Sequence, residues 1–396
     1  MTDARELEVA TADDSEGIAS ESEHEYPSRN TTPPSLEEFD RWQAHIGLQK
    51  FGEGLNAAAR AIFPRDGRPQ YSNVYVLMLS FGEEGTSSGI TNLSSIFKEV
   101  YHFDVEVWTI PSEGSKAATN QKVSQFIGLG GDSYEDLKIV YYAGNARLIR
   151  NKELAWTSGI KTLSSKYPVV PWKGIQKSLE NAQSDVLILL DAPFVGVSTA
   201  NQGSGVTELI AASAFGTVAN AADPYSFTRD LETEFRELSK LPSFSVGNLY
   251  HNLFCRIQCR IAENGTDDGV PLCLQLTQED LKVPRSIRLS AHQKDADFPS
   301  SLNPTPTVTN GAFRASSPAG DTPRIAFAIR LKEDFKVGDL SSDLFLEWLR
   351  RIPESVAEVK IEAGFHSYSS LLVVSVPICM SLYMPKDPAI INLGPI

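Results

Sequence analysis

The chain has 396 residues, of which 41% are hydrophobic and 22% charged, and this composition is typical of a soluble globular protein with two or three domains. Its net charge of −14 disfavours general binding to nucleic acid. No apolar run approaches the roughly 20 residues that a membrane-spanning helix needs, and the first residues lack the basic and apolar regions of a signal peptide. We therefore expect a cytoplasmic protein that binds neither nucleic acid nor membranes.

The first 35 residues are acidic and rich in Ser and Thr. They contain nine acidic and two basic side chains and end in Thr-Thr-Pro-Pro-Ser, which predicts a disordered tail. An amphipathic helix is expected to open at Ser35, and it either packs on the core or docks a partner. Its apolar face would carry Phe39, Trp42, Ile46, Phe51, Leu55 and Ala59.

From Tyr71 onwards, apolar strands alternate with amphipathic helices. Successive strand–helix units predict an α/β fold, a doubly wound and mainly parallel sheet with helices on both faces. A small hairpin is expected around Trp156. The predicted strands are Val74–Phe81, Asp104–Ile110, Asp136–Gly144, Asp185–Asp191 and Val270–Leu276, with the apolar segment Val206–Ser213 between the last two. The predicted helices are Ser88–Val100, Ser115–Leu129, Trp172–Asn181, Ser226–Leu238 and Ser245–Ile261.

The composition changes after His292. Residues 291–323 are rich in Pro, Ser, Thr and Asn without periodicity, which indicates a linker. The following pattern predicts a small α+β unit of order β-α-β-β, half of a ferredoxin-like unit. Its elements would be the strand Arg324–Leu331, the helix Leu344–Ile352 and the strands Val356–Ile361 and Leu371–Met380.

These patterns divide the chain into five segments. They are the acidic tail 1–35, the helix and connector 36–70, the α/β domain 71–290, the linker 291–323 and the C-terminal unit 324–396.

Two of the predicted strands end abruptly in small or polar residues. One ends in Ala143-Gly144-Asn145 and the other in Asp191-Ala192-Pro193. Ligands and catalytic groups gather at the carboxyl ends of the strands in open α/β sheets. We therefore expect any active site of this protein at these two strand ends.

Both stretches resemble the catalytic segments of the caspase-like cysteine peptidases, the metacaspase and caspase group, and most of all the caspase-like domains of filamentous fungi. The resemblance rests on YYAGNA and LLDAPFVG and covers roughly Tyr71–Leu289. It places Asn145 where the family has its histidine and Pro193 where the family has its cysteine. Within the second motif Asp191 and Gly196 match, and Ala192 fills the variable position between Asp191 and Pro193. The resemblance implies the caspase-like version of the predicted fold.

The two departures remove the groups that the family's reaction needs. That reaction uses a thiolate nucleophile and an imidazole that moves protons near neutral pH. The amide of Asn145 does not titrate in that range, and Pro193 has neither a nucleophilic atom nor a backbone N–H for an oxyanion. The sequence therefore predicts a pseudopeptidase, catalytically inactive and without a cofactor.

The resemblance then implies a binding or regulatory module with a protein or peptide partner, in fungal cell-death or self-recognition signalling. Two alternatives stay open. One is a hydrolase that uses another nucleophile, with Asp191 and a neighbouring Ser or Lys. The other is a structural or accessory protein that makes its contacts through the tail and the C-terminal unit.

The four cysteines offer a second candidate site. Cys255 and Cys259 are four residues apart on a predicted helix, so they share a face with each other and with His251. This spacing fits either a metal or redox pair or two buried thiols, and the second reading is favoured. No histidine is spaced to complete a zinc site, so we expect no bound metal.

Overall fold

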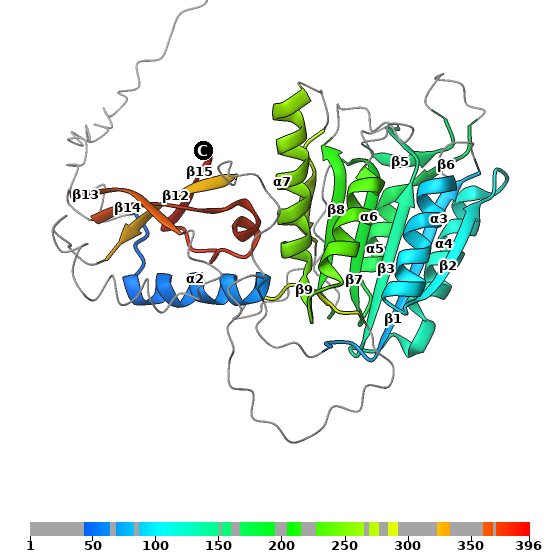
Figure 1. Cartoon of the computed structure of the whole chain (residues 1–396), viewed down its shortest axis with the longest axis horizontal. Helices are drawn as coiled ribbons and strands as arrows, with labels where there is room; N and C mark the ends of the chain where they lie inside the picture. Colours follow the sequence, from blue (N-terminus) through cyan, green and yellow to red (C-terminus); the bar gives the residue numbers. More distant parts are fainter. Residues whose placement is uncertain are drawn as a thin grey trace, which may run out of the picture. The chain divides into compact units, whose positions relative to one another are not determined.

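The computed structural model describes twelve stretches of the chain (Figure 1). They are residues 43–63, 69–82, 87–149, 153–159, 167–194, 204–214, 227–264, 269–276, 284–291, 323–332, 359–366 and 370–396.

A six-stranded sheet lies at the centre, in the order β10-β8-β7-β3-β1-β2. Every neighbouring pair is parallel except β10 with β8, which is antiparallel at one edge. The predicted mainly parallel α/β sheet is therefore confirmed. Its strands are β1 (Asn73–Phe81), β2 (Asp104–Ile110), β3 (Asp136–Ala143), β7 (Asp185–Phe194), β8 (Thr207–Ala214) and β10 (Leu272–Gln275).

Helices cover both faces of this sheet (Figure 1), because its inner strands are apolar on both sides. Tyr141 and Leu189 face the core that α3, α6 and α7 share, whereas Tyr142 and Leu190 face the core under α4 and α5. The doubly wound arrangement is confirmed as well. The helices are α3 (Ser87–Ser95), α4 (Ser115–Ile127), α5 (Trp172–Glu180), α6 (Phe227–Leu238) and α7 (Val246–Asn264).

Short elements connect these layers. A π-helical turn, Ile96–Val100, continues α3, and a 3₁₀ turn, Leu129–Gly131, follows α4. The expected hairpin around Trp156 is present as part of a three-stranded antiparallel sheet, β4 (Asn145–Leu148), β5 (Leu154–Thr157) and β6 (Val169–Pro171). Two-residue strands β9 (Phe244–Ser245) and β11 (Arg288–Leu289) pair beside α7.

The amphipathic helix near the N-terminus begins later than expected. In the structure α2 spans Leu48–Ile62, and residues 36–42 of the predicted helix lie outside the described part of the chain. Ile46 is not helical, because its N–H donates to Arg330 O (2.9 Å) and its carbonyl accepts from Lys332 N–H (3.0 Å). Ile46 therefore pairs like a strand residue, although the apolar spacing of the sequence placed it on the predicted helix.

The C-terminal residues form an antiparallel sheet of order β13-β14-β12-β15. The fourth strand, β15, was not expected, and the predicted helix Leu344–Ile352 lies outside the described residues. The last predicted strand is too long, because a 3₁₀ turn (Ile378–Leu382) replaces it after Pro377, whose missing N–H cannot extend a ladder. The strands are β12 (Arg324–Leu331), β13 (Lys360–His366), β14 (Ser370–Pro377) and β15 (Ile390–Pro395).

A buried hydrogen-bond network ties this C-terminal part to the central sheet. The hydroxyl of Tyr383 donates to Glu208 Oε1 on β8 (2.6 Å) and lies 2.9 Å from the Ser286 hydroxyl. The second oxygen of Glu208 accepts from the N–H of Ile287 (2.9 Å) and from Ser286. Apolar side chains of β12 and β14 also share one core with α2 and α7.

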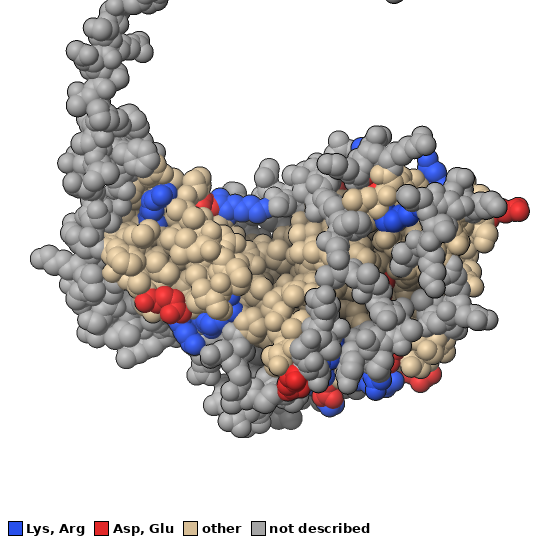
Figure 2. All heavy atoms as spheres, turned by 90° about the horizontal axis from the view of Figure 1, so that it is seen from above, with Lys and Arg blue, Asp and Glu red and all other residues tan. Residues whose placement is uncertain are grey.

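On the face drawn in Figure 2, described Lys and Arg side chains lie scattered beside Asp and Glu. None of the described helices combines the length and the apolar character needed to cross a membrane.

Candidate functional site

The two expected motif strands are neighbours, and their carboxyl ends lie together. Ala143, the last residue of β3, pairs with Asp191 on β7. The N–H of Gly144 donates to the carbonyl of Asp191 (3.4 Å). Asn145 and Pro193 each lie two residues beyond this pair in the sequence, but they pair with different partners, Asn145 with Thr157 on β5 and Pro193 with Ser213 on β8.

Asn145 and Pro193 both belong to strands in the structure. Asn145 begins β4 and pairs with Thr157, and it is half-buried. Pro193 lies inside β7, which continues to Phe194, so the expected end of this strand at Asp191 is three residues too early. The ladder to β8 continues through Pro193 and Ser213 because a register shift after Leu190 absorbs one residue. Gly196 lies outside the described residues.

Gly144 is required for the chain to turn from β3 into β4. Its φ of +156° lies in the region that favours glycine. A Cβ at this position would lie 2.7 Å from the Tyr142 hydroxyl oxygen. That hydroxyl donates to the carbonyl of Asn145 (2.8 Å), and the Tyr142 ring stacks on Trp156 with centroids 4.0 Å apart and planes within 4°. The side chain of Tyr142 thus fixes the turn, through its hydrogen bond to Asn145 and its stacking on Trp156.

Asp191 is buried and points to the face covered by α6. The hydroxyl and the backbone N–H of Thr228, in the first turn of α6, both donate to its carboxylate. Since an ionised carboxylate only accepts, the Thr228 hydroxyl in turn accepts from Tyr141 Oη (2.6 Å). Burial raises the pKa of Asp191, and the Thr228 hydrogen bonds oppose that shift.

This arrangement favours a positioning role for Asp191. Only 4% of its surface is exposed, and it accepts two hydrogen bonds from Thr228 on α6. The carboxylate therefore joins the end of β7 to the start of α6. Ser213 beside Pro193 is 2% exposed, and its hydroxyl has no hydrogen-bond partner among the described residues. Its burial keeps this hydroxyl away from solvent as well.

The four cysteines lie away from these strand ends. Cys255 and Cys259 are on α7, Cys273 is on β10, and Cys379 lies in the 3₁₀ turn after β14, and all four are free thiols. Cys255 is buried with its sulfur 3.8 Å from His251 Nε2, whereas Cys259 is partly exposed. Within the described part of the chain, no three His, Cys, Asp or Glu side chains converge to hold a metal ion.

Comparison with known proteins adds little to this geometry. No family model and no curated protein matches the sequence. Among solved structures, caspase-1 from Spodoptera frugiperda is similar, with a TM-score of 0.38 and 10% identity over 56% of this chain and 90% of that chain. A structure of pro-sf-caspase-1 is also similar, with a TM-score of 0.35 and 12% identity over 57% of this chain and all of the other. At these scores and identities, neither likeness decides the fold or the activity of the present chain.

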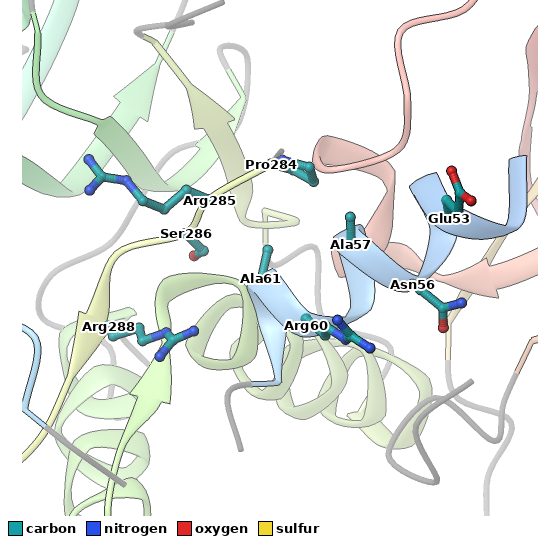
Figure 3. A pocket seen from close by; sticks show the side chains of 9 residues that line it. All are labelled: Glu53, Asn56, Ala57, Arg60, Ala61, Pro284, Arg285, Ser286 and Arg288. Carbon is teal, nitrogen blue, oxygen red and sulfur yellow. The ribbon is translucent and has the colours of Figure 1, made fainter. Parts of the chain in front are cut away.

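A pocket that the sequence did not predict lies between α2 and the segment before β11. It is lined by Glu53, Asn56, Ala57, Arg60, Ala61, Pro284, Arg285, Ser286 and Arg288 (Figure 3). More than 220 residues separate its two walls in the sequence. Neither wall carries a motif, so only the folded chain reveals that the two segments line one pocket.

Proposed function

We propose that this protein is a catalytically inactive member of the caspase-like group that acts as a protein- or peptide-binding module. The observation that supports the proposal is that the two motif strands pair up to Ala143 and Asp191, and that Asn145 and Pro193 each follow two residues later in the sequence. An amide and a pyrrolidine ring stand where the resembling family has its imidazole and its thiol. Neither can take up a proton near neutral pH or attack a carbonyl.

The surroundings of this pair support binding over chemistry. The carboxylate nearest to Pro193 in the chain, Asp191, is buried and hydrogen-bonded to α6. The nearest described hydroxyl across the ladder, Ser213, is also buried. A sheet edge without a catalytic pair can still hold an extended peptide through backbone hydrogen bonds. A cytoplasmic role in fungal cell-death or self-recognition signalling extends this proposal by resemblance.

The second candidate, a hydrolase with another nucleophile, needs an accessible hydroxyl, thiol or amine activated by a base. The burial of Asp191 argues against a catalytic pair of Asp191 with a neighbouring Ser or Lys.

A single experiment separates the two candidates. The purified full chain is incubated with a mixed peptide library, with and without Ca²⁺, and the products are read by mass spectrometry.

We expect the library to remain intact. A repeatable cut at a defined residue preference would contradict the proposal and favour the hydrolase.

The binding half of the proposal is tested with two matched substitutions. Proteins captured from an extract are compared between the wild type and Asn145→Arg, which adds bulk and charge at the edge where β3 and β7 end. Asn181→Arg is the control, because Asn181 is exposed at the opposite end of β7. The proposal expects partners that are lost only with Asn145→Arg, and partners that persist in both variants would place the contacts elsewhere.

A further inference from the structure

Strand β2 forms one edge of the central sheet and lies at the outer end of the strand order (Figure 1). All seven of its residues pair with β1 in one unbroken parallel register. No described strand pairs with its other side. An edge strand presents a row of N–H and C=O groups with which a further strand can pair.

The side chains of β2 are open to solvent along most of the strand. Four of its seven residues are exposed, whereas none of the four residues of β10, at the opposite edge of the sheet, is exposed. Val107, at the centre of β2, has 49% of its surface exposed, and its neighbour Trp108 is only half-buried. An uncovered edge strand with an apolar centre favours pairing with another chain.

β2 also lacks the irregularities that commonly protect edge strands from such pairing. The edge strands of the C-terminal sheet, β13 and β15, each have a register shift against their neighbour, and β15 contains Gly394 and Pro395. In contrast, β2 has no register shift, no glycine and no proline. Two acidic side chains, Asp104 and Glu106, remain to limit what can pair with it.

These two acids restrict the sequence of a partner strand. The Glu106 carboxylate forms an ion pair with Lys122 on α4, which compensates its charge in part. Like charges directly opposite each other destabilise a pair of antiparallel strands. A suitable partner strand therefore has no acidic side chain opposite Asp104 or Glu106.

A second copy of β2 meets this condition in one register. When two copies pair antiparallel about a two-fold axis at Val107, Glu106 lies opposite Trp108 and Asp104 lies opposite Ile110. The two exposed Val107 side chains then lie opposite each other on one face of the joined sheet. In this register the strand is complementary to itself.

The neighbouring registers are less favourable. Moving the axis to Glu106 sets this carboxylate against its own copy. Moving the axis to Trp108 sets Val105 opposite Pro111, which lies beyond the end of β2 and has no backbone N–H. The sequence of β2 therefore favours a single register centred on Val107.

We propose that this protein forms a homodimer in which β2 pairs antiparallel with β2 of a second copy, centred on Val107. The two central sheets then join into one continuous sheet, and the same surface of each copy forms the interface. Because a pair of seven-residue strands is a small interface, the dissociation constant lies in the micromolar range. The interface is separate from the strand ends at Gly144 and Asp191, so it stands or falls independently of the function proposed above.

Sedimentation velocity of the full chain tests the dimer over protein concentrations from about 1 to about 200 μM, which bracket a micromolar dissociation constant. We expect the sedimentation coefficient to rise with concentration. Val107→Lys places an ammonium group opposite its own copy and weakens the dimer about tenfold or more. Val270→Lys makes the same change at a valine of similar exposure (41%), close to the opposite edge of the sheet, and leaves the dimer unchanged.

Three results of this experiment overturn the proposal. One is a wild type that stays monomeric over the whole concentration range. The second is an equal weakening by both substitutions, since added charge rather than its position would then decide the outcome. The third is a dimer that both variants retain at full strength, because β2 would then not form the contact.

Cysteine cross-linking tests the register by a readout that a folding defect does not imitate. Val107→Cys should give a disulfide-linked dimer on oxidation with diamide, because opposite residues of antiparallel strands have Cα atoms about 4.5–5.5 Å apart, within reach of a disulfide. Thr109→Cys is the control on the same strand, since its two copies lie four residues apart along the pair, about 13 Å. The wild type gives the background from the four native cysteines. Equal cross-linking of the two variants, or none in Val107→Cys, contradicts pairing centred on Val107.

Discussion

Glu208 is a buried titratable residue in the hydrogen-bond network that joins β8 to Tyr383. It is fully buried, and desolvation raises its pKa from the ordinary value to about 7, although the Tyr383, Ile287 and Ser286 hydrogen bonds oppose this shift. Its carboxyl group therefore titrates in the folded protein near physiological pH. The same side chain joins β8 to Tyr383 and Ser286, so its charge state acts on the junction between the central sheet and the C-terminal part.

The pKa of Glu208 predicts how stability depends on pH. The folded-state value of about 7 exceeds the ordinary 4.5, so between these values the folded state binds the proton and the unfolded state does not. Stability should thus fall as pH rises from about 5 to about 8, by on the order of 3 kcal/mol from this residue. Urea denaturation at a series of pH values measures the slope.

Glu208→Gln isolates this contribution because it removes the titration and keeps the shape. The variant should show a flatter decline between pH 5 and 8, and at pH 8 it should be more stable than the wild type. Asp230, whose pKa is raised to about 6 chiefly by burial, gives a residual slope of the same sign in both proteins. The exposed Glu237→Gln is the control, and an unchanged slope in Glu208→Gln would refute the assignment.

At the scale of elements, the end of β7 is coupled to the start of α6 through Thr228. This residue bonds to both Asp191 and Tyr141, so one hydroxyl connects two strands and a helix. The contact explains why a carboxylate can sit beneath α6 at the sheet edge without exposure to solvent.

Replacing Thr228 with Val keeps the branched shape and deletes the hydroxyl. We expect a loss of about 1–3 kcal/mol in unfolding free energy, because Asp191 and Tyr141 each lose a buried partner. Thr233→Val on the same helix is the matched control, since the Thr233 hydroxyl only bonds back to Arg229 O at the surface. Similar losses in the two variants would show that the Thr228 contact contributes nothing beyond helix formation.

The elements also show what the sequence could predict. Continuous apolar runs identified β3 and β7 as inner parallel strands, since burial on both faces leaves no alternation. The short strand β15 was not predicted, because Ile390–Pro395 includes a Gly and a Pro and its pairing partner β12 is distant in the sequence. The late start of α2 has a similar cause, because Ile46 pairs with residues almost 300 positions away.

The strand ends and the pocket also differ in whether a local sequence pattern predicts them. The motifs at Gly144 and Asp191 are local, and the sheet register indeed brings their ends together. The pocket between α2 and Pro284–Arg288 depends on two segments that are distant in the sequence, and no local pattern marks their contact. The burial of Asp191 could not be foreseen either, since it depends on where α6 begins.

At the scale of the whole molecule, residues 43–396 form one compact unit. Phe327, Val374 and Met380 from the C-terminal part lie in the same core as Leu55 and Leu253. Described apolar side chains thus form one core that extends from the C-terminal sheet to the helices α2 and α7.

Removing residues 324–396 should therefore abolish cooperative unfolding. The truncated chain would expose the apolar faces of α2 and α7, and we expect strong binding of a hydrophobic dye and no sharp thermal transition. Deleting residues 1–35 is the control and should leave the melting temperature unchanged within about 2 °C, because the acidic, Ser- and Thr-rich composition of this segment predicts disorder. A truncated chain that melts sharply would show that the α/β part folds alone.

The stacked rings of Tyr142 and Trp156 should give a near-ultraviolet circular dichroism signal that reports on the turn after β3. Two rings that are parallel and 4.0 Å apart couple their electronic transitions, and the Tyr142 hydroxyl is fixed to the carbonyl of Asn145. A molecule that settles on the turn at Gly144 would disturb this stack. Near-ultraviolet circular dichroism can therefore follow occupancy of the strand ends in the unlabelled protein.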